Sequence, residues 1–86
     1  MIEEIQEKLE EIYDFLEIEV KYSTIKKYLI KLTIKCSEKN IIKRSVMFEY
    51  SWNDKWTFSA NIKQIKYTIN KYFKLYLERE VNNENN

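Results

Sequence analysis

Residues 28–52, "YLIKLTIKCSEKNIIKRSVMFEYSW", decide the fold of this chain. Apolar and polar residues alternate in both halves of the stretch, and alternation with a period of two is typical of strands. "SEKN" at 37–40 has the composition of a turn, in which Asn40 tolerates a left-handed backbone without glycine. The stretch therefore predicts an antiparallel hairpin. The side chains expected on its inner face are Tyr28, Ile30, Leu32, Ile34 and Cys36 from the first strand and Ile42, Val46, Phe48, Tyr50 and Trp52 from the second.

The segments on either side of the hairpin extend the sheet. Ile18, Val20 and Tyr22 alternate with polar residues and predict a strand over 18–22. "NDK" at 53–55 predicts a second turn, after which "WTF" at 56–58 could add a short fourth strand.

The two ends of the chain have helical periodicity. A helix is predicted over 2–16, since Ile2, Ile5, Leu9, Ile12 and Leu16 recur on one helical face. A second helix is predicted over 61–80, with Ser59 or Asn61 as its N-cap. Its expected buried stripe is Ile62, Ile65, Ile69, Tyr72, Phe73, Tyr76 and Leu77.

These elements predict an α+β fold: a helix, a three- to four-stranded antiparallel meander sheet and a long C-terminal helix. Each helix has a single apolar face, so both are expected on one face of the sheet. Residues 1–80 are predicted to form a single α+β domain, and the polar residues 81–86 a frayed tail. The other sheet face is expected to be solvated and to carry Lys21, Lys31, Lys35, Lys43, Ser45, Met47 and Glu49.

Composition disfavours several classes of function. The 86 residues include no His, Gly or Pro and one Cys. Histidine is the commonest general base, and glycine-rich phosphate-binding loops need glycine. The chain is therefore predicted to be a non-enzymatic, cytoplasmic protein with no metal or cofactor and no membrane span. Cys36 ends a strand on its apolar side and is expected to be an inert hydrophobic residue.

Acidic residues concentrate at the start of the chain. Residues 1–19 hold eight carboxylates against Lys8 alone, although the net charge of the whole chain is +1. Carboxylates three or four residues apart on a helix form a stripe that could enter a basic groove of a protein partner. The predicted partner-binding residues are Glu3, Glu4, Glu7, Glu10, Glu11 and Asp14. Two other interpretations are open: a merely solvated face, or a face neutralised by the Lys-rich last helix.

The middle of the chain is basic. Residues 21–74 hold thirteen Lys or Arg against three acids, which could provide a surface for nucleic acid. The candidate nucleic-acid-binding residues are Lys21, Lys31, Lys35, Lys43, Lys63 and Lys66. Alternating lysines also protect sheets from edge pairing. Trp52 and Trp56 flank the second turn and are expected to close one end of the core, the alternative being exposed interface anchors.

Two resemblances bear on these hypotheses. The element order resembles that of the double-stranded-RNA-binding domain, but "SANIKQIKY" at 59–67 holds only Lys63 and Lys66 where that family has a lysine cluster. In kind, the acidic stripe, the AT-rich codon usage implied by the composition and the missing active site resemble the small phage-encoded anti-CRISPR and anti-defence inhibitors. That resemblance implies a protein that blocks the nucleic-acid groove of a host defence nuclease. A homodimer joined along the apolar stripe of the first helix is a further hypothesis.

Overall fold

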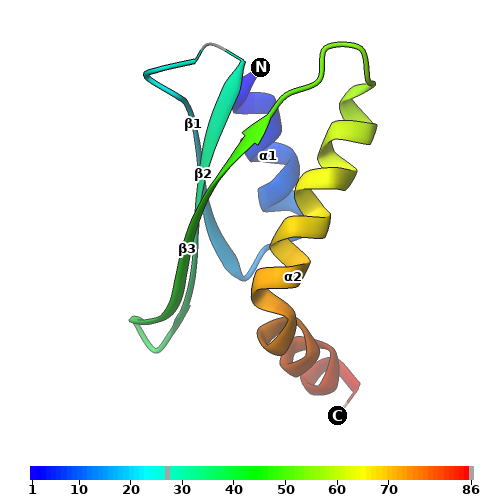
Figure 1. Ribbon diagram of the computed structural model, residues 1–86. Coiled ribbons are helices and arrows are strands. Elements are labelled where there is room, and N and C mark those ends of the chain that lie inside the picture. Colours follow the sequence, from blue (N-terminus) through cyan, green and yellow to red (C-terminus); the bar gives the residue numbers. More distant parts are fainter. Residues whose placement is uncertain (27, 86) are drawn as a thin grey trace.

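The computed structural model describes residues 1–26 and 28–85, with side chains as far as residue 77. The elements are α1 (Ile2–Ile12), β1 (Leu16–Tyr22), β2 (Leu29–Glu38), β3 (Ile41–Ser51) and α2 (Phe58–Asn85). The strands form one antiparallel sheet in the order β1-β2-β3. Both helices lie on the same face of this sheet, as Figure 1 shows. The predicted α+β fold is confirmed.

The predicted hairpin is formed by β2 and β3, with Ile34 opposite Val46. Its turn places Lys39 and Asn40 at positive φ (53° and 64°), so two non-glycine residues occupy the left-handed region. A β-bulge follows, because Cys36 pairs with Arg44 whereas Ser37 pairs with Ile42. The extra residue in β3 reverses the alternation of faces. Ile42 is consequently 54% exposed, and its predicted inward position is wrong.

The first helix is shorter than the predicted 2–16. It ends at Ile12, since Tyr13 leaves helical geometry (φ −121°, ψ 73°). Leu16 begins β1 and is buried there. Its spacing fits both periods, because it lies four residues after Ile12 and two before Ile18.

The last helix begins earlier than the predicted residue 61. The backbone N–H of Ala60 donates to Thr57 Oγ1 (3.1 Å), so Thr57 is the N-cap and not Ser59 or Asn61. No fourth strand forms at 56–58 in the described chain, since Phe58 is already helical. The helix is kinked at Phe73 (φ −114°, ψ 19°) and continues to Asn85, through most of the predicted frayed tail. Residue 86 lies outside the described residues.

The core lies between the sheet and the two helices. Ile5 and Leu9 of α1 and Ile65, Ile69 and Phe73 of α2 are all fully buried. The inward side chains of β1 and β2 are buried too, except that of Tyr22 at the end of β1, which is 52% exposed. Those of β3 are only half-buried: Val46, Phe48 and Tyr50. The helices therefore cover the β1–β2 side of the sheet better than the β3 side. Neither α1 nor the described part of α2 is long and apolar enough to cross a membrane.

Candidate protein-binding face on α1

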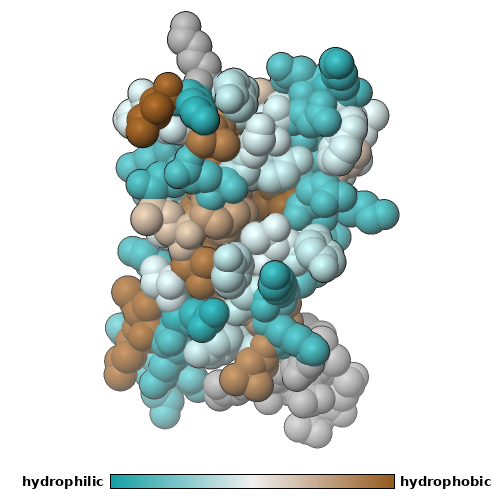
Figure 2. All heavy atoms as spheres, in the orientation of Figure 1, coloured by the Kyte–Doolittle hydropathy of each residue, from teal (hydrophilic) through white to brown (hydrophobic). Residues whose placement is uncertain are grey.

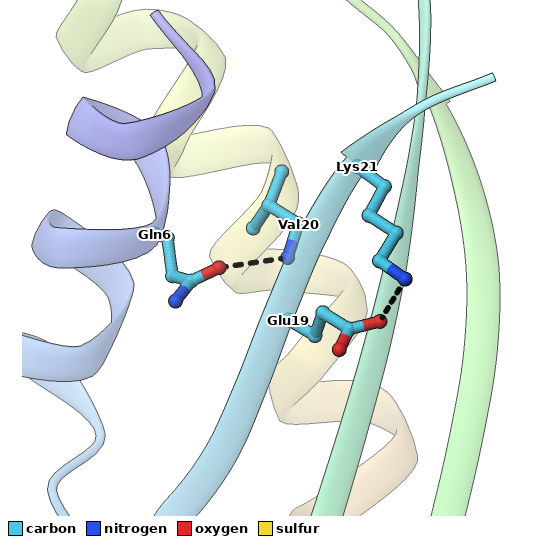
Figure 3. Close-up of polar contacts among 4 residues, drawn as sticks. All are labelled: Gln6, Glu19, Val20 and Lys21. Carbon is cyan, nitrogen blue, oxygen red and sulfur yellow. Dashed lines mark hydrogen bonds and ion pairs between the residues drawn. The ribbon is translucent and has the colours of Figure 1, made fainter.

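Helix α1 is held against the sheet by one side and presents the opposite side to solvent. Ile5 and Leu9 anchor it in the core. At the flank of the helix, Gln6 Oε1 accepts a hydrogen bond from the backbone N–H of Val20 (3.1 Å), which belongs to edge strand β1 (Figure 3). These contacts fix the rotation of α1. This rotation leaves exposed the carboxylates of Glu3, Glu4, Glu7, Glu10 and Glu11. Asp14, which follows the end of the helix, is exposed as well, so all six of the predicted residues lie at the surface.

The acidic side chains of α1 make no ion pair among the described residues. The ion pair that the described residues do form joins Lys21 Nζ to Glu19 Oε1 (3.3 Å) in β1, on the outer sheet face (Figure 3). Helix α2 does lie beside α1, since side chains of both helices line one groove, and the hydroxyl of Tyr13, just after α1, donates to Asn70 Oδ1. No described lysine of α2 forms an ion pair with an α1 carboxylate. Helix α2 therefore does not neutralise the acidic face through direct ion pairs.

A basic groove lies next to the acidic face, between the two helices. Its volume is about 310 Å³, and it is lined by Lys8, Ile12, Phe58, Ser59, Ile62, Lys63 and Lys66. The floor is apolar, the charged lining residues are all lysines, and two of them were candidates for nucleic-acid binding. Lys8 was missed from the sequence, because its nearness to Lys63 and Lys66 depends on how α1 packs beside α2.

The candidate nucleic-acid-binding lysines do not form one surface. Lys21, Lys31 and Lys35 lie on the outer sheet face, and Lys43 lies at the bulge, whereas Lys63 belongs to α2 on the opposite side of the sheet. The register places acids among the outer lysines, with Glu17 opposite Lys35 and Glu49 opposite Lys31. Together with Glu19, these acids make the outer face mixed in charge rather than uniformly basic.

The two tryptophans differ. Trp52 is half-buried, with its ring centroid 5.8 Å from that of Phe58, and so it packs against the core as predicted. Trp56 is 48% exposed, so its predicted burial is wrong. Its side chain stays at the surface because the turn that it follows leads directly into α2. Cys36 is buried at the edge of the core, where it was expected. Tyr28 is 56% exposed, because it precedes β2 and lies at the open end of the sheet.

Two polar groups in the core were not foreseen as buried. The amide of Asn61 is fully buried and binds Tyr50, Asn53 and Thr57. Tyr13 is 4% exposed, and burial raises the pKa of its hydroxyl from 10.0 to about 12. Burial also raises the pKa of Tyr50. Both hydroxyls are held in their neutral, donating form and tie α2 to the rest of the fold.

The described residues hold no group of three or more His, Cys, Asp or Glu side chains arranged to bind a metal ion. Comparisons with protein-family models, with curated proteins and with solved structures find no match to this chain.

Proposed function

We propose that this chain is a non-enzymatic protein-binding module that presents the acidic face of α1 to a basic groove of a partner protein. The observation that carries the proposal is the exposure of the five α1 carboxylates and of Asp14 just after the helix, none of which forms an ion pair among the described residues. An acidic face that served only to neutralise α2 would be expected to engage its lysines. This face instead leaves its charge available to another molecule.

The geometry of the face favours a groove that normally holds nucleic acid. The 11 residues of α1 extend over about 16 Å, with neighbouring carboxylates roughly 5–6 Å apart. A row of this kind offers anions at a spacing comparable to that of phosphates along one strand. The partner we propose is a nucleic-acid-binding effector, such as a defence nuclease, and the mechanism is occlusion of its groove. Inhibition of the anti-CRISPR type is the finer form of this proposal.

Affinity capture with matched charge reversals tests the proposal. The variant Glu7→Lys/Glu10→Lys/Glu11→Lys reverses the exposed face of α1. The control Glu17→Lys/Glu19→Lys/Glu49→Lys makes the same change of charge on the outer sheet face, where all three acids are also exposed. We expect the wild type and the control to capture the same protein from a nuclease-treated bacterial lysate and the α1 variant to lose it. Circular dichroism establishes that both variants are folded.

Two results would overturn the proposal. One is capture of the same protein by the α1 variant at wild-type yield. The other is loss of capture from the wild type when nucleic acid is digested, since the contact would then run through nucleic acid.

The groove between the helices favours a second candidate, binding of nucleic acid by the helical layer. Lys8, Lys63 and Lys66 converge there without an acidic lining residue. Titration of a labelled oligonucleotide at several salt concentrations tests it, because phosphate contacts give an affinity that falls steeply with salt. We expect substitution of these three lysines by Gln to remove such binding, whereas the α1 charge reversal would strengthen it.

A further inference from the structure

The outer edge of β3 is the longest strand edge in the described chain that pairs with no other strand. β3 has 11 residues and is an edge strand of the sheet. The other edge is treated differently, since the backbone N–H of Val20 in β1 is bound by the side chain of Gln6. Exposed edges of this kind pair readily with other strands unless charges, prolines or bulges protect them.

The protection of β3 is confined to one end. The bulge and two charged residues, Lys43 and Arg44, occupy the hairpin end. The following seven residues, "SVMFEYS" at 45–51, contain no proline and one charge, at Glu49. This segment is a regular strand with an unpaired edge.

The register identifies the free backbone groups. The Trp52 N–H donates to Tyr28 O (3.1 Å), so the pair formed by these residues is hydrogen-bonded across β2 and β3. Hydrogen-bonded and non-hydrogen-bonded pairs alternate along an antiparallel ladder. The residues opposite Leu29, Lys31, Thr33 and Lys35 therefore direct their N–H and C=O groups away from β2. They are Ser45, Met47, Glu49 and Ser51.

An apolar strip accompanies this edge on the helical side of the sheet. Val46, Phe48 and Tyr50 are only half-buried. The Phe48 ring stacks on Tyr72 of α2 at 6.0 Å between centroids, and Tyr72 is still 40% exposed. Leu75, one turn further along α2, is 65% exposed. Figure 2 shows hydrophobic and intermediate residues crossing the middle of this face, where β3 and α2 come together in the orientation of Figure 1.

We propose that the β3 edge pairs with β3 of a second copy of this chain, which joins the two sheets into one antiparallel sheet. A two-fold axis at Met47 places Met47 opposite its own copy and Ser45 opposite Glu49 of the copy. No like charges then face each other within the segment, whereas a register centred on Glu49 would oppose two carboxylates. An isologous contact of this kind closes after two copies.

The helices leave room for such a contact. Although α2 contacts β3 through Phe48–Tyr72 and Tyr50–Asn61, the inward residues of β3 stay half-buried, so α2 leaves the side of β3 next to its outer edge partly uncovered. With the axis perpendicular to the sheet, the two α2 helices lie side by side and cover the apolar strip of both copies. The acidic face of α1, which packs beside β1, stays free on each copy, so this inference is independent of the proposed function.

Sedimentation of the full chain over a wide range of concentration tests the inference. We expect the wild type to reach about twice the monomer mass of 10.7 kDa. Met47→Pro removes an N–H that faces away from β2, so it leaves the internal ladder intact but blocks pairing at the axis. Leu75→Lys introduces a charge into the apolar strip that the proposed dimer would cover. Tyr67→Lys is the matched control, because Tyr67 is 71% exposed on the solvent side of α2.

We expect Met47→Pro and Leu75→Lys to sediment as folded monomers and Tyr67→Lys to remain a dimer. Amide exchange gives a second readout that does not depend on any variant. The amides of Met47 and Glu49 should become protected as the wild-type concentration rises. A wild type that stays monomeric at every concentration, or a dimer that survives both substitutions, would overturn the inference.

Discussion

The side chain of Asn61 uses each of its two polar atoms twice. Its Oδ1 accepts from the Tyr50 hydroxyl (2.6 Å) and from the Asn53 N–H (3.0 Å). Its Nδ2 donates to the carbonyl oxygens of Asn53 and Thr57, both at 3.0 Å. Asn61 thus fixes the connection between β3 and α2 from inside the core. From the sequence it was predicted to be a helix cap, because a polar residue near a helix start is most often found there.

We expect Asn61→Ala to lower the free energy of unfolding by about 3 kcal/mol, because it leaves the Tyr50 hydroxyl and the main chain of Asn53 without partners. Asn70→Ala is the control on the same helix. The Asn70 side chain is exposed and accepts one bond, from Tyr13, so its loss should cost about 1 kcal/mol. Urea unfolding measures both. Equal losses for the two variants would show that the buried Asn61 network stabilises the fold no more than the single hydrogen bond of Asn70.

At the scale of elements, α2 begins about one turn before the start that its sequence predicts. Thr57, Ser59 and Asn61 are all residues that cap helices well. The structure selects Thr57, since Asn61 is used in the core and Phe58 packs against Trp52. The hypothesis of a fourth strand at 56–58 was wrong for the same reason.

The choice of cap has a measurable consequence. Thr57→Ala should lower the free energy of unfolding by about 1 kcal/mol, because the N–H of Ala60 loses its acceptor. Ser59→Ala should have almost no effect, because Ser59 is exposed inside the first turn. Urea unfolding of the two variants distinguishes the caps, and a larger loss for Ser59→Ala would contradict the capping role of Thr57.

The alternation of residues predicted β1 and β2 well and β3 less well. In β2 every inward residue from Ile30 to Cys36 is buried, because one face meets the core along the whole strand. In β3 the bulge reverses the faces of the residues that precede Arg44, and no turn-forming or glycine residue marks the bulge in the sequence. Ile42 was misplaced on that account. A one-residue shift of this kind depends on pairing with β2 and is not visible in β3 alone.

For the molecule as a whole, the net charge of +1 conceals two separated sets of charge. The acidic set on α1 could be predicted, because its residues are close in sequence and share one helical face. The basic groove could not, because Lys8 joins Lys63 and Lys66 only through tertiary packing. The apolar stripe of α1 packs inside the chain, since Ile5 and Leu9 are fully buried, so these two residues do not offer a surface for the dimer seam that the sequence suggested.

Concentrating acids on one exposed helix has a cost in stability, and Glu7 is at its centre. Glu3, Glu4, Glu10 and Glu11 lie three or four residues from Glu7, and like charges at these spacings destabilise a helix by roughly 0.2–0.5 kcal/mol per pair. We therefore expect Glu7→Gln to raise the free energy of unfolding by about 1 kcal/mol. Glu17→Gln is the control, because Glu17 faces Lys35 across the sheet and its neutralisation should be slightly destabilising.

The same pair of variants links this cost to function. If the acidic face binds a basic groove, Glu7→Gln should weaken capture of the partner while it stabilises the fold, and Glu17→Gln should leave capture unchanged. Urea unfolding and affinity capture of the same two variants provide the two measurements. A Glu7→Gln variant that is less stable than the wild type would mean that the Glu7 carboxylate is paired within the chain. The acidic face of α1 would then not be available to a partner, which contradicts the proposed function.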